Sequence, residues 1–226
     1  MSERQRRLSQ EYFICNLMKS RIQNPEIRIR SYQGSVLWME PILKQGIIMN
    51  YANIKERDIA NGPGVRVSLF VSGCNHHCKG CFNEVAWDFN YGEPFTEETI
   101  DHIIELLKPD YIKGLTILGG EPMEPINQKG ILPLVQRVRE TYPEKTIWCY
   151  TGFTYETDIL NNMMNRYPVT RELLPLLDVL VDGKFEIELL DLKLRFRGSS
   201  NQRIIDLKKS REKGETVLWE NDSVFG

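Results

Sequence analysis

The amino-acid sequence predicts an α/β fold, an incomplete TIM-like barrel of parallel strands with outer helices. Strand-like and helix-like segments alternate at least three times over residues 65–181, as in a parallel sheet with crossover helices. The chemically distinctive residues all follow these strands, at the edge where such sheets carry their sites. With 226 residues the chain is shorter than the about 250 residues typical of eight strand–helix units, so we expect an incomplete barrel.

The strands are predicted from apolar runs of the kind found in buried parallel sheets. The first follows the turn-forming segment Asn61–Gly64. Two further short strands are expected near the C-terminus, where the pattern is less regular. The predicted strands are Val65–Val71, Leu115–Leu118, Thr146–Tyr150, Val179–Val181, Leu192–Phe196 and Ile204–Leu207.

Helices are predicted between the strands. Thr96 offers an N-cap for the first, whose isoleucine and leucine side chains between residues 100 and 107 share one face, and Pro109 ends it. A second helix follows, with Pro133 expected in its first turn, where proline is tolerated. Apolar residues at helical spacing over 159–167 predict a third.

Composition excludes several classes of protein. The net charge of −2 gives no electrostatic case for nucleic acid as a partner. No apolar run approaches the roughly 20 residues that a membrane span needs. Five cysteines, three of them clustered, do not suggest a secreted disulfide framework. We therefore expect a cytoplasmic protein that binds neither membranes nor nucleic acid.

Residues 1–48 differ from the rest of the chain. They are locally basic and carry no motif with recognisable chemistry. Met49 could itself be a start of translation. We interpret residues 1–48 as an appendage or a mis-called start, and residues 49–226 as the functional domain.

The loop after the first strand holds three cysteines, Cys74, Cys78 and Cys81, spaced C-x₃-C-x₂-C. Three thiols cannot all pair as disulfides, but they can bind one metal centre. An electron-transfer [4Fe–4S] cluster takes four protein thiolates. Three would leave one iron open to a substrate or cofactor. The remaining cysteines, Cys15 and Cys149, are interpreted as small apolar residues.

Zinc is the rival interpretation of this loop. Structural zinc sites commonly use two ligand pairs separated by a spacer, and no second pair is present. His76 and His77 lie between the first two cysteines, which makes a poor tetrahedral chelate, so both are interpreted as ordinary loop residues. A zinc-stabilised binding module without catalysis remains the alternative of a different class.

Taken together, the motifs resemble a known family. The C-x₃-C-x₂-C loop followed by Gly119-Gly120-Glu121-Pro122 is similar to the radical S-adenosylmethionine superfamily. Within it, five segments from about Met49 to about Arg203 resemble the activating proteins of anaerobic ribonucleoside-triphosphate reductases. They are Asn61–Gly64, Phe70–Cys74, Gly80–Asn83, Val179–Phe185 and Gly198–Gln202.

This resemblance implies a set of cofactor contacts. Cys74, Cys78 and Cys81 would hold a [4Fe–4S] cluster, and its open iron would bind the methionine part of S-adenosylmethionine. The other implied contacts are Gly119 and Gly120 beside the methionine backbone, Glu121 with the ammonium group, Lys184 with the carboxylate, Gly80 and Phe82 along the adenosyl group, and Thr151.

The resemblance also implies the reaction. A reduced cluster would cleave S-adenosylmethionine, and the resulting 5′-deoxyadenosyl radical would take a Cα hydrogen from a glycine of the anaerobic reductase. Flavodoxin or ferredoxin would supply the electron. An activase of another glycyl-radical enzyme, such as pyruvate formate-lyase, is the alternative within the same chemistry.

Overall fold

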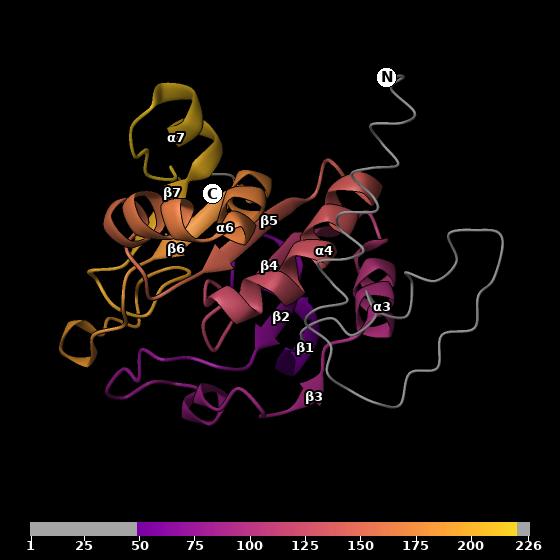
Figure 1. The fold of residues 1–226 in the computed structure, drawn as a ribbon, viewed down its shortest axis with the longest axis horizontal. Helices are drawn as coiled ribbons and strands as arrows, with labels where there is room; N and C mark the ends of the chain where they lie inside the picture. The colour runs from indigo at the N-terminus through magenta and orange to yellow at the C-terminus, as the bar shows by residue number, and fades with distance from the viewer. Residues whose placement is uncertain (1–48, 221–226) are drawn as a thin grey trace, which may run out of the picture. The chain divides into compact units, whose positions relative to one another are not determined.

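The computed structural model describes residues 49–220, and Figure 1 shows their arrangement. The interpretation of residues 1–48, including that of Cys15, lies outside these residues. Seven strands form one sheet in the order β3-β1-β2-β4-β5-β6-β7. Their bounds are β1 (Asn50–Asp58), β2 (Val65–Val71), β3 (Glu93–Pro94), β4 (Ile112–Gly119), β5 (Thr146–Tyr150), β6 (Val179–Asp182) and β7 (Arg203–Asp206).

The centre of the sheet is parallel and its margins are antiparallel. Strands β2, β4, β5 and β6 pair in parallel, as the sequence predicts. Strands β1 and β3 on one side and β7 on the other join antiparallel. This mixed sheet confirms the α/β class and the parallel centre. It does not confirm a TIM-like barrel, because the flanking strands reverse direction rather than continue the parallel series.

Helical segments occupy the connections. They are η1 (Glu84–Trp87), α3 (Glu97–Leu107), α4 (Pro125–Thr141), the π-helical η2 (Tyr155–Met163), α5 (Met164–Arg166), α6 (Pro168–Leu173), η3 (Leu174–Leu176), η4 (Ile187–Leu189) and α7 (Leu207–Lys213). Thr96 caps α3 as predicted, through a capping box with Thr99. Among residues 49–220, no helix combines the length and apolarity needed to cross a membrane.

Two predictions about local structure were wrong, and one strand was missed. Pro133 lies inside α4 rather than in its first turn, because the helix already begins at Pro125. Leu192–Phe196 is not a strand: Leu192 is 86% exposed and Phe196 has a left-handed φ of 59°. The polar strand β1 was missed, because its sequence lacks an apolar run.

The two faces of the sheet are packed differently. Helices α3, α4 and α6 cover one face, in front of the sheet in Figure 1, and form the main core with strand residues such as Leu69, Ile117 and Cys149. The prediction that Cys149 is a core residue is thereby confirmed. The other face carries a smaller cluster built on Trp148, with Phe196 and Trp219 against its ring.

Arg66 joins three strands on this second face. Its guanidinium is fully buried and donates to the hydroxyls of Thr116 (2.7 Å) and Thr146 (2.9 Å), and to the carbonyl of Leu115 (2.8 Å). The ring of Trp148 lies 5.5 Å from the guanidinium carbon. Burial lowers the pKa of Arg66 to about 10. The residue therefore stays charged at neutral pH, satisfied by neutral acceptors.

We predict that Arg66→Met destabilises the fold by about 3 kcal/mol, since it leaves buried hydroxyls and carbonyls without a donor. Unfolding by urea should show this loss. Arg57→Met, at an exposed position of β1, is the matched control and should unfold like the wild type. Equal stability of the two variants would contradict a structural role for Arg66.

Candidate iron–sulfur site

The loops after β2, β4, β5 and β6 surround one cavity of about 450 Å³. Most of the predicted site residues line it. They are Cys74, Cys78, Cys81, Phe82, Gly119, Gly120, Glu121 and Thr151. Gly80 and Lys184 lie outside the lining, each next to a residue that belongs to it. The fold thus gathers at one strand edge residues that the sequence separates by up to 77 positions.

The cysteines differ in their surroundings. Cys74 is 7% exposed, and burial raises the pKa of its thiol to about 11. Burial also raises the pKa of Cys78, although the Lys184 ammonium and the backbone N–H of Phe185 act in the opposite direction. Both thiols favour the protonated form in the protein alone. Binding of iron as thiolates would therefore release protons.

The cysteine thiols of the cavity are its candidate metal ligands. Within residues 49–220, no three His, Cys, Asp or Glu side chains converge closely enough to hold one metal ion. A cubane cluster is instead ligated at separate iron corners. The only other cysteine of this part of the chain, Cys149, is buried in the core. The cavity therefore offers three thiols, one fewer than an electron-transfer [4Fe–4S] cluster takes from the protein.

The cysteine loop is bonded directly to the loop after β4. Backbone N–H groups of Gly120 and Glu121 donate to the carbonyls of Val71 (2.7 Å) and Gly73 (2.8 Å). A Cβ on Gly120 would lie 2.6 Å from the Gly73 oxygen, so only glycine permits this approach. The packing of the two loops thus already requires a glycine here, independently of any cofactor.

Asn127, in the first turns of α4, strengthens this junction. Its buried side-chain amide donates to the carbonyls of Ser72 (3.1 Å), Gly73 (3.2 Å) and Glu121 (2.9 Å). One side chain thereby fixes the entry of the cysteine loop against the acidic residue of the next loop. Sequence reasoning missed Asn127, because a lone asparagine in a helix carries no pattern.

Glu121 is 1% exposed and has partners from three segments. Its carboxylate accepts hydrogen bonds from the backbone N–H groups of Met123 (2.8 Å) and Gly152 (2.7 Å). His76 Nε2 lies 2.9 Å from the same carboxylate, and the His76 ring packs against Phe153. His76 is a loop residue, as interpreted, but sequence reasoning missed its contact with Glu121. His77, by contrast, is exposed and stacks on Trp87.

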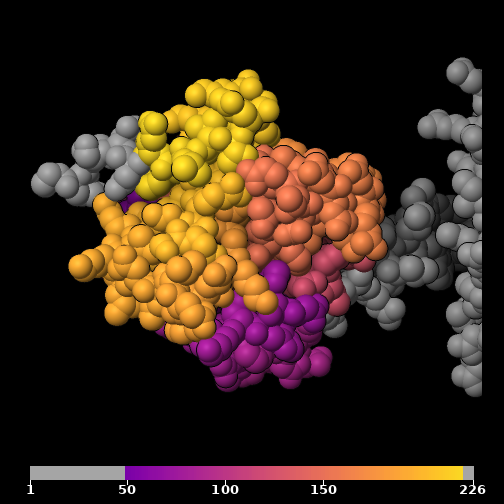
Figure 2. Space-filling view, turned by 90° about the vertical axis from the view of Figure 1, so that its left-hand side faces the viewer, coloured from indigo at the N-terminus to yellow at the C-terminus, as the bar shows by residue number. Residues whose placement is uncertain are grey.

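One wall of the cavity is formed by the loops after β2, β4 and β5. The chain that follows β6, from Gly183 onwards, forms a second wall. Residues 183–188 run beside the later half of the cysteine loop, and Figure 2 shows the orange and purple segments meeting on this side. The rings of Phe82 and Phe185 are 5.2 Å apart, and the Lys79 ammonium lies 3.2 Å from Glu188. The Lys184 side chain is exposed and acts electrostatically on Cys78.

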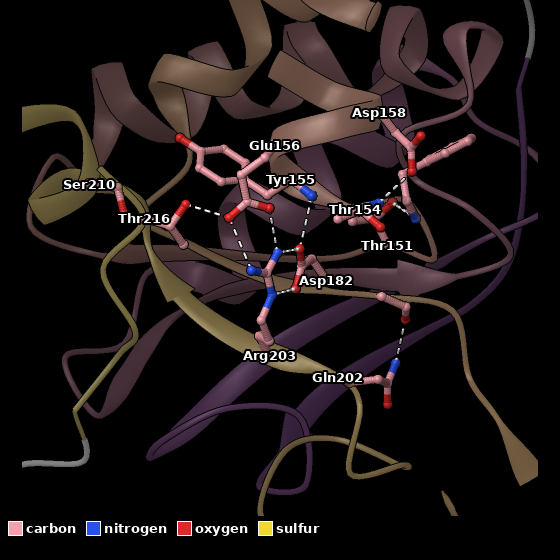
Figure 3. A network of polar contacts seen from close by, with 12 residues as sticks. Thr151, Thr154, Tyr155, Glu156, Asp158, Asp182, Gln202, Arg203, Ser210 and Thr216 are labelled. Carbon is pink, nitrogen blue, oxygen red and sulfur yellow. Dashed lines mark hydrogen bonds and ion pairs between the residues drawn. The ribbon is translucent and has the colours of Figure 1, made fainter. Parts of the chain in front are cut away.

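A charged network lies behind this second wall (Figure 3). The Arg203 guanidinium donates to Asp182, which is 1% exposed, and to both carboxylate oxygens of Glu156. Asp182 also accepts from the backbone N–H of Tyr155 (2.9 Å), and Glu156 accepts from the hydroxyl of Thr216. The network joins the end of β6 to β7, η2 and the C-terminal segment.

The chain is similar to a known protein family and to several curated proteins that share one name. Residues 60–205 match the family described as a 4Fe-4S single cluster domain. The anaerobic ribonucleoside-triphosphate reductase-activating protein of Vibrio cholerae is 47% identical over 159 residues, which cover 69% of this chain and 97% of the relative. The protein of the same name from Escherichia coli K12 is 46% identical over 162 residues, covering 71% and 100%. That from Enterobacteria phage T4 is 44% identical over 156 residues, covering 69% and 93%.

We predict that Asn127→Asp weakens both the fold and the site. The change keeps the shape but replaces the donor with a carboxylate oxygen that faces three carbonyls. We expect a loss of about 2–4 kcal/mol in the free energy of unfolding and less iron bound per chain after anaerobic reconstitution. Asn161→Asp, at an exposed position, is the control. Unchanged stability and iron content would contradict a junction held by Asn127.

We predict a pH dependence from Glu156. Hydrogen bonds from Arg203 lower its pKa from the ordinary 4.5 to about 2. A lowered pKa in the folded state contributes stability that is present above about pH 4.5 and is lost as the pH falls towards 2. Glu156→Gln should therefore lose less stability over this interval than the wild type, measured by urea unfolding at several pH values. Glu172→Gln, at an exposed position, should keep the wild-type profile, and an identical profile for Glu156→Gln would disprove the linkage.

Proposed function

Since this chain belongs to the family of anaerobic ribonucleoside-triphosphate reductase-activating proteins, we propose that it generates the glycyl radical of such a reductase. It is an activating enzyme of the oxidoreductase class with a [4Fe–4S] cluster. One observation carries this proposal: three cysteines of a C-x₃-C-x₂-C loop line the same cavity as the Gly119–Glu121 loop.

In this proposal Cys74, Cys78 and Cys81 hold the cluster, and S-adenosylmethionine binds at its open iron. When bound, these groups supply the reductive cleavage of S-adenosylmethionine, which yields a 5′-deoxyadenosyl radical able to take a Cα hydrogen from glycine. Flavodoxin or ferredoxin supplies the electron. Residues 49–226 form the radical S-adenosylmethionine domain.

Glu121 receives the ammonium group of S-adenosylmethionine. An ionised carboxylate has about four acceptor sites, and three contacts to Glu121 are present in the protein. The Glu121 carboxylate therefore keeps an acceptor site for a further donor. Because the carboxylate is buried, a charge-assisted hydrogen bond from a cation is favoured there. The contacts from Met123, Gly152 and His76 fix the direction of the carboxylate.

The remaining contacts distribute over the cavity walls. Gly119 and Gly120 present no side chain to the methionine part, Gly80 and Phe82 border the adenosyl group, and Thr151 contacts it from the end of β5. Lys184 pairs with the carboxylate of the cofactor from the second wall.

Apolar groups keep water from the reacting atoms. The rings of Phe70, Tyr150, Phe185 and Phe196 and the side chain of Leu118 line the cavity beside the polar contacts. Exclusion of water strengthens the electrostatic contacts inside and protects a reactive radical from side reactions. We expect a glycine-bearing segment of the reductase to enter the cavity, which lies on the sheet face opposite α3, α4 and α6.

The decisive test is radical formation. The full chain, reconstituted anaerobically, is mixed with dithionite, S-adenosylmethionine and either an anaerobic ribonucleoside-triphosphate reductase or pyruvate formate-lyase. Electron paramagnetic resonance should detect a glycyl radical on the reductase, and Cys78→Ala should abolish it while Cys149→Ala retains it. A radical on the lyase alone would overturn the choice of partner. A colourless protein with stoichiometric zinc would overturn the enzyme assignment, and the match to a 4Fe-4S domain supports the opposite outcome.

A further inference from the structure

The segment Gly198–Arg203 has no part in the proposed chemistry, yet its polar groups converge on one neighbour. Only Gly198 and Gln202 of this segment line the cavity. The side chains of Ser199, Asn201, Gln202 and Arg203 all bond to residues 182–186, which follow β6. A surface turn of similar composition would direct such groups to water.

The side-chain amides of Asn201 and Gln202 bond to the backbone of residues 182–186. Asn201 Nδ2 donates to the carbonyl of Lys184 (2.8 Å) and to the Glu186 carboxylate (3.2 Å). Gln202 Nε2 donates to the carbonyl of Gly183 (3.0 Å). Two consecutive carbonyls of the second wall are therefore bonded by two consecutive side chains.

The turn that carries these amides is itself closed by Gln202. Its Oε1 accepts from the backbone N–H groups of Gly198 (2.8 Å) and Ser199 (3.2 Å). Although Gln202 lines the cavity, its amide oxygen and one N–H are thus used within the protein. The residue is placed to position the wall rather than to bind a ligand.

Arg203 fixes the other end of the same wall. Its bonds to Asp182, described above, hold the residue directly before Gly183. The buried hydroxyl of Ser199 accepts from the backbone N–H of Glu186 (3.3 Å), beyond Lys184. Residues 182–186 are therefore held at both ends and in the middle.

The held stretch lies against the cysteine loop. Phe185 contacts Phe82, and a Cβ built on Gly80 would lie 3.1 Å from Ile187. Lys184 stands between these contacts and the end of β6. Its distance from the cofactor site therefore depends on how residues 182–186 are anchored.

We propose that Gly198–Arg203 forms a clamp that positions residues 182–186 so that Lys184 can hold the carboxylate of S-adenosylmethionine. Asn201 and Gln202 are positioning residues that act through Lys184 and do not touch the cofactor. The inference rests on the proposed function, because it takes S-adenosylmethionine as the ligand.

The first test uses Asn201→Ala, because Asn201 does not line the cavity and its loss leaves the lining intact. Asn165→Ala is the matched control, since Asn165 also donates one amide hydrogen bond to a carbonyl (2.8 Å, Asn161), but on α5. Gln202→Glu is a second variant. It keeps the acceptors for Gly198 and Ser199, replaces the donor to Gly183 with a carboxylate oxygen, and adds a negative charge to the cavity lining.

Two measurements are made on each full-length variant. Hydrogen exchange of residues 183–190 should become faster in Asn201→Ala and Gln202→Glu and stay unchanged in Asn165→Ala. The Kd for S-adenosylmethionine, followed by its effect on the electron paramagnetic resonance spectrum of the reduced cluster, should rise about tenfold, which corresponds to about 1.4 kcal/mol. Iron content should remain that of the wild type.

A double-mutant cycle with Lys184→Met tests the route of the effect. If Asn201 acts through Lys184, adding Asn201→Ala to Lys184→Met should raise the Kd little further. Additive effects would overturn the inference, as would faster exchange with an unchanged Kd or exchange that does not change. The wild type is tested for radical formation in the same preparation. If the proposed function itself fails, the wild type forms no radical and its cluster does not respond to S-adenosylmethionine.

Discussion

The site depends on a direct junction between two loops from adjacent strands. The cysteine loop and the loop after β4 share backbone hydrogen bonds, and the Asn127 amide reinforces them from α4. Because β2 and β4 are parallel neighbours, their ends already lie side by side. Glu121 is therefore oriented towards the cysteines by the protein itself. A cofactor that binds there meets groups already in place, which reduces the entropy lost on binding.

The unequal packing of the two sheet faces makes room for this site. Helices bury one face, whereas aromatic rings and the Arg66 guanidinium occupy the other near the amino ends of the strands. Towards the carboxyl ends the second face opens into the cavity. Arg66 satisfies buried acceptors without a carboxylate, so the strands are joined there without adding negative charge beneath the site.

Local sequence patterns predicted the central strands well. The bounds of β2 and β5 match the prediction, because apolar residues occupy most positions of both strands. The marginal parts of the sheet were not predictable in the same way. Strand β1 is polar. The strand-like pattern of Leu192–Phe196 belongs to a loop, in which Phe196 packs on Trp148. Topology placed most of the predicted site residues around one cavity. The contacts of Asn127 and His76 required coordinates, since neither residue belongs to a pattern that periodicity or spacing can detect.

The second wall has one more property, which concerns how such enzymes could diversify. Gly183 to Arg203 is a single continuous stretch, whereas the other wall is assembled from three separate loops. Arg203, at the end of this stretch, bonds to Glu156 and Asp182 (Figure 3). The stretch is also held by the Gly183 N–H, which donates to the carbonyl of Phe153, and by the Tyr150 hydroxyl, which donates to the carbonyl of Phe196. An exchange of this stretch between relatives would therefore transplant one wall of the cavity in one recombination event, provided that its contacts with the rest of the protein are kept.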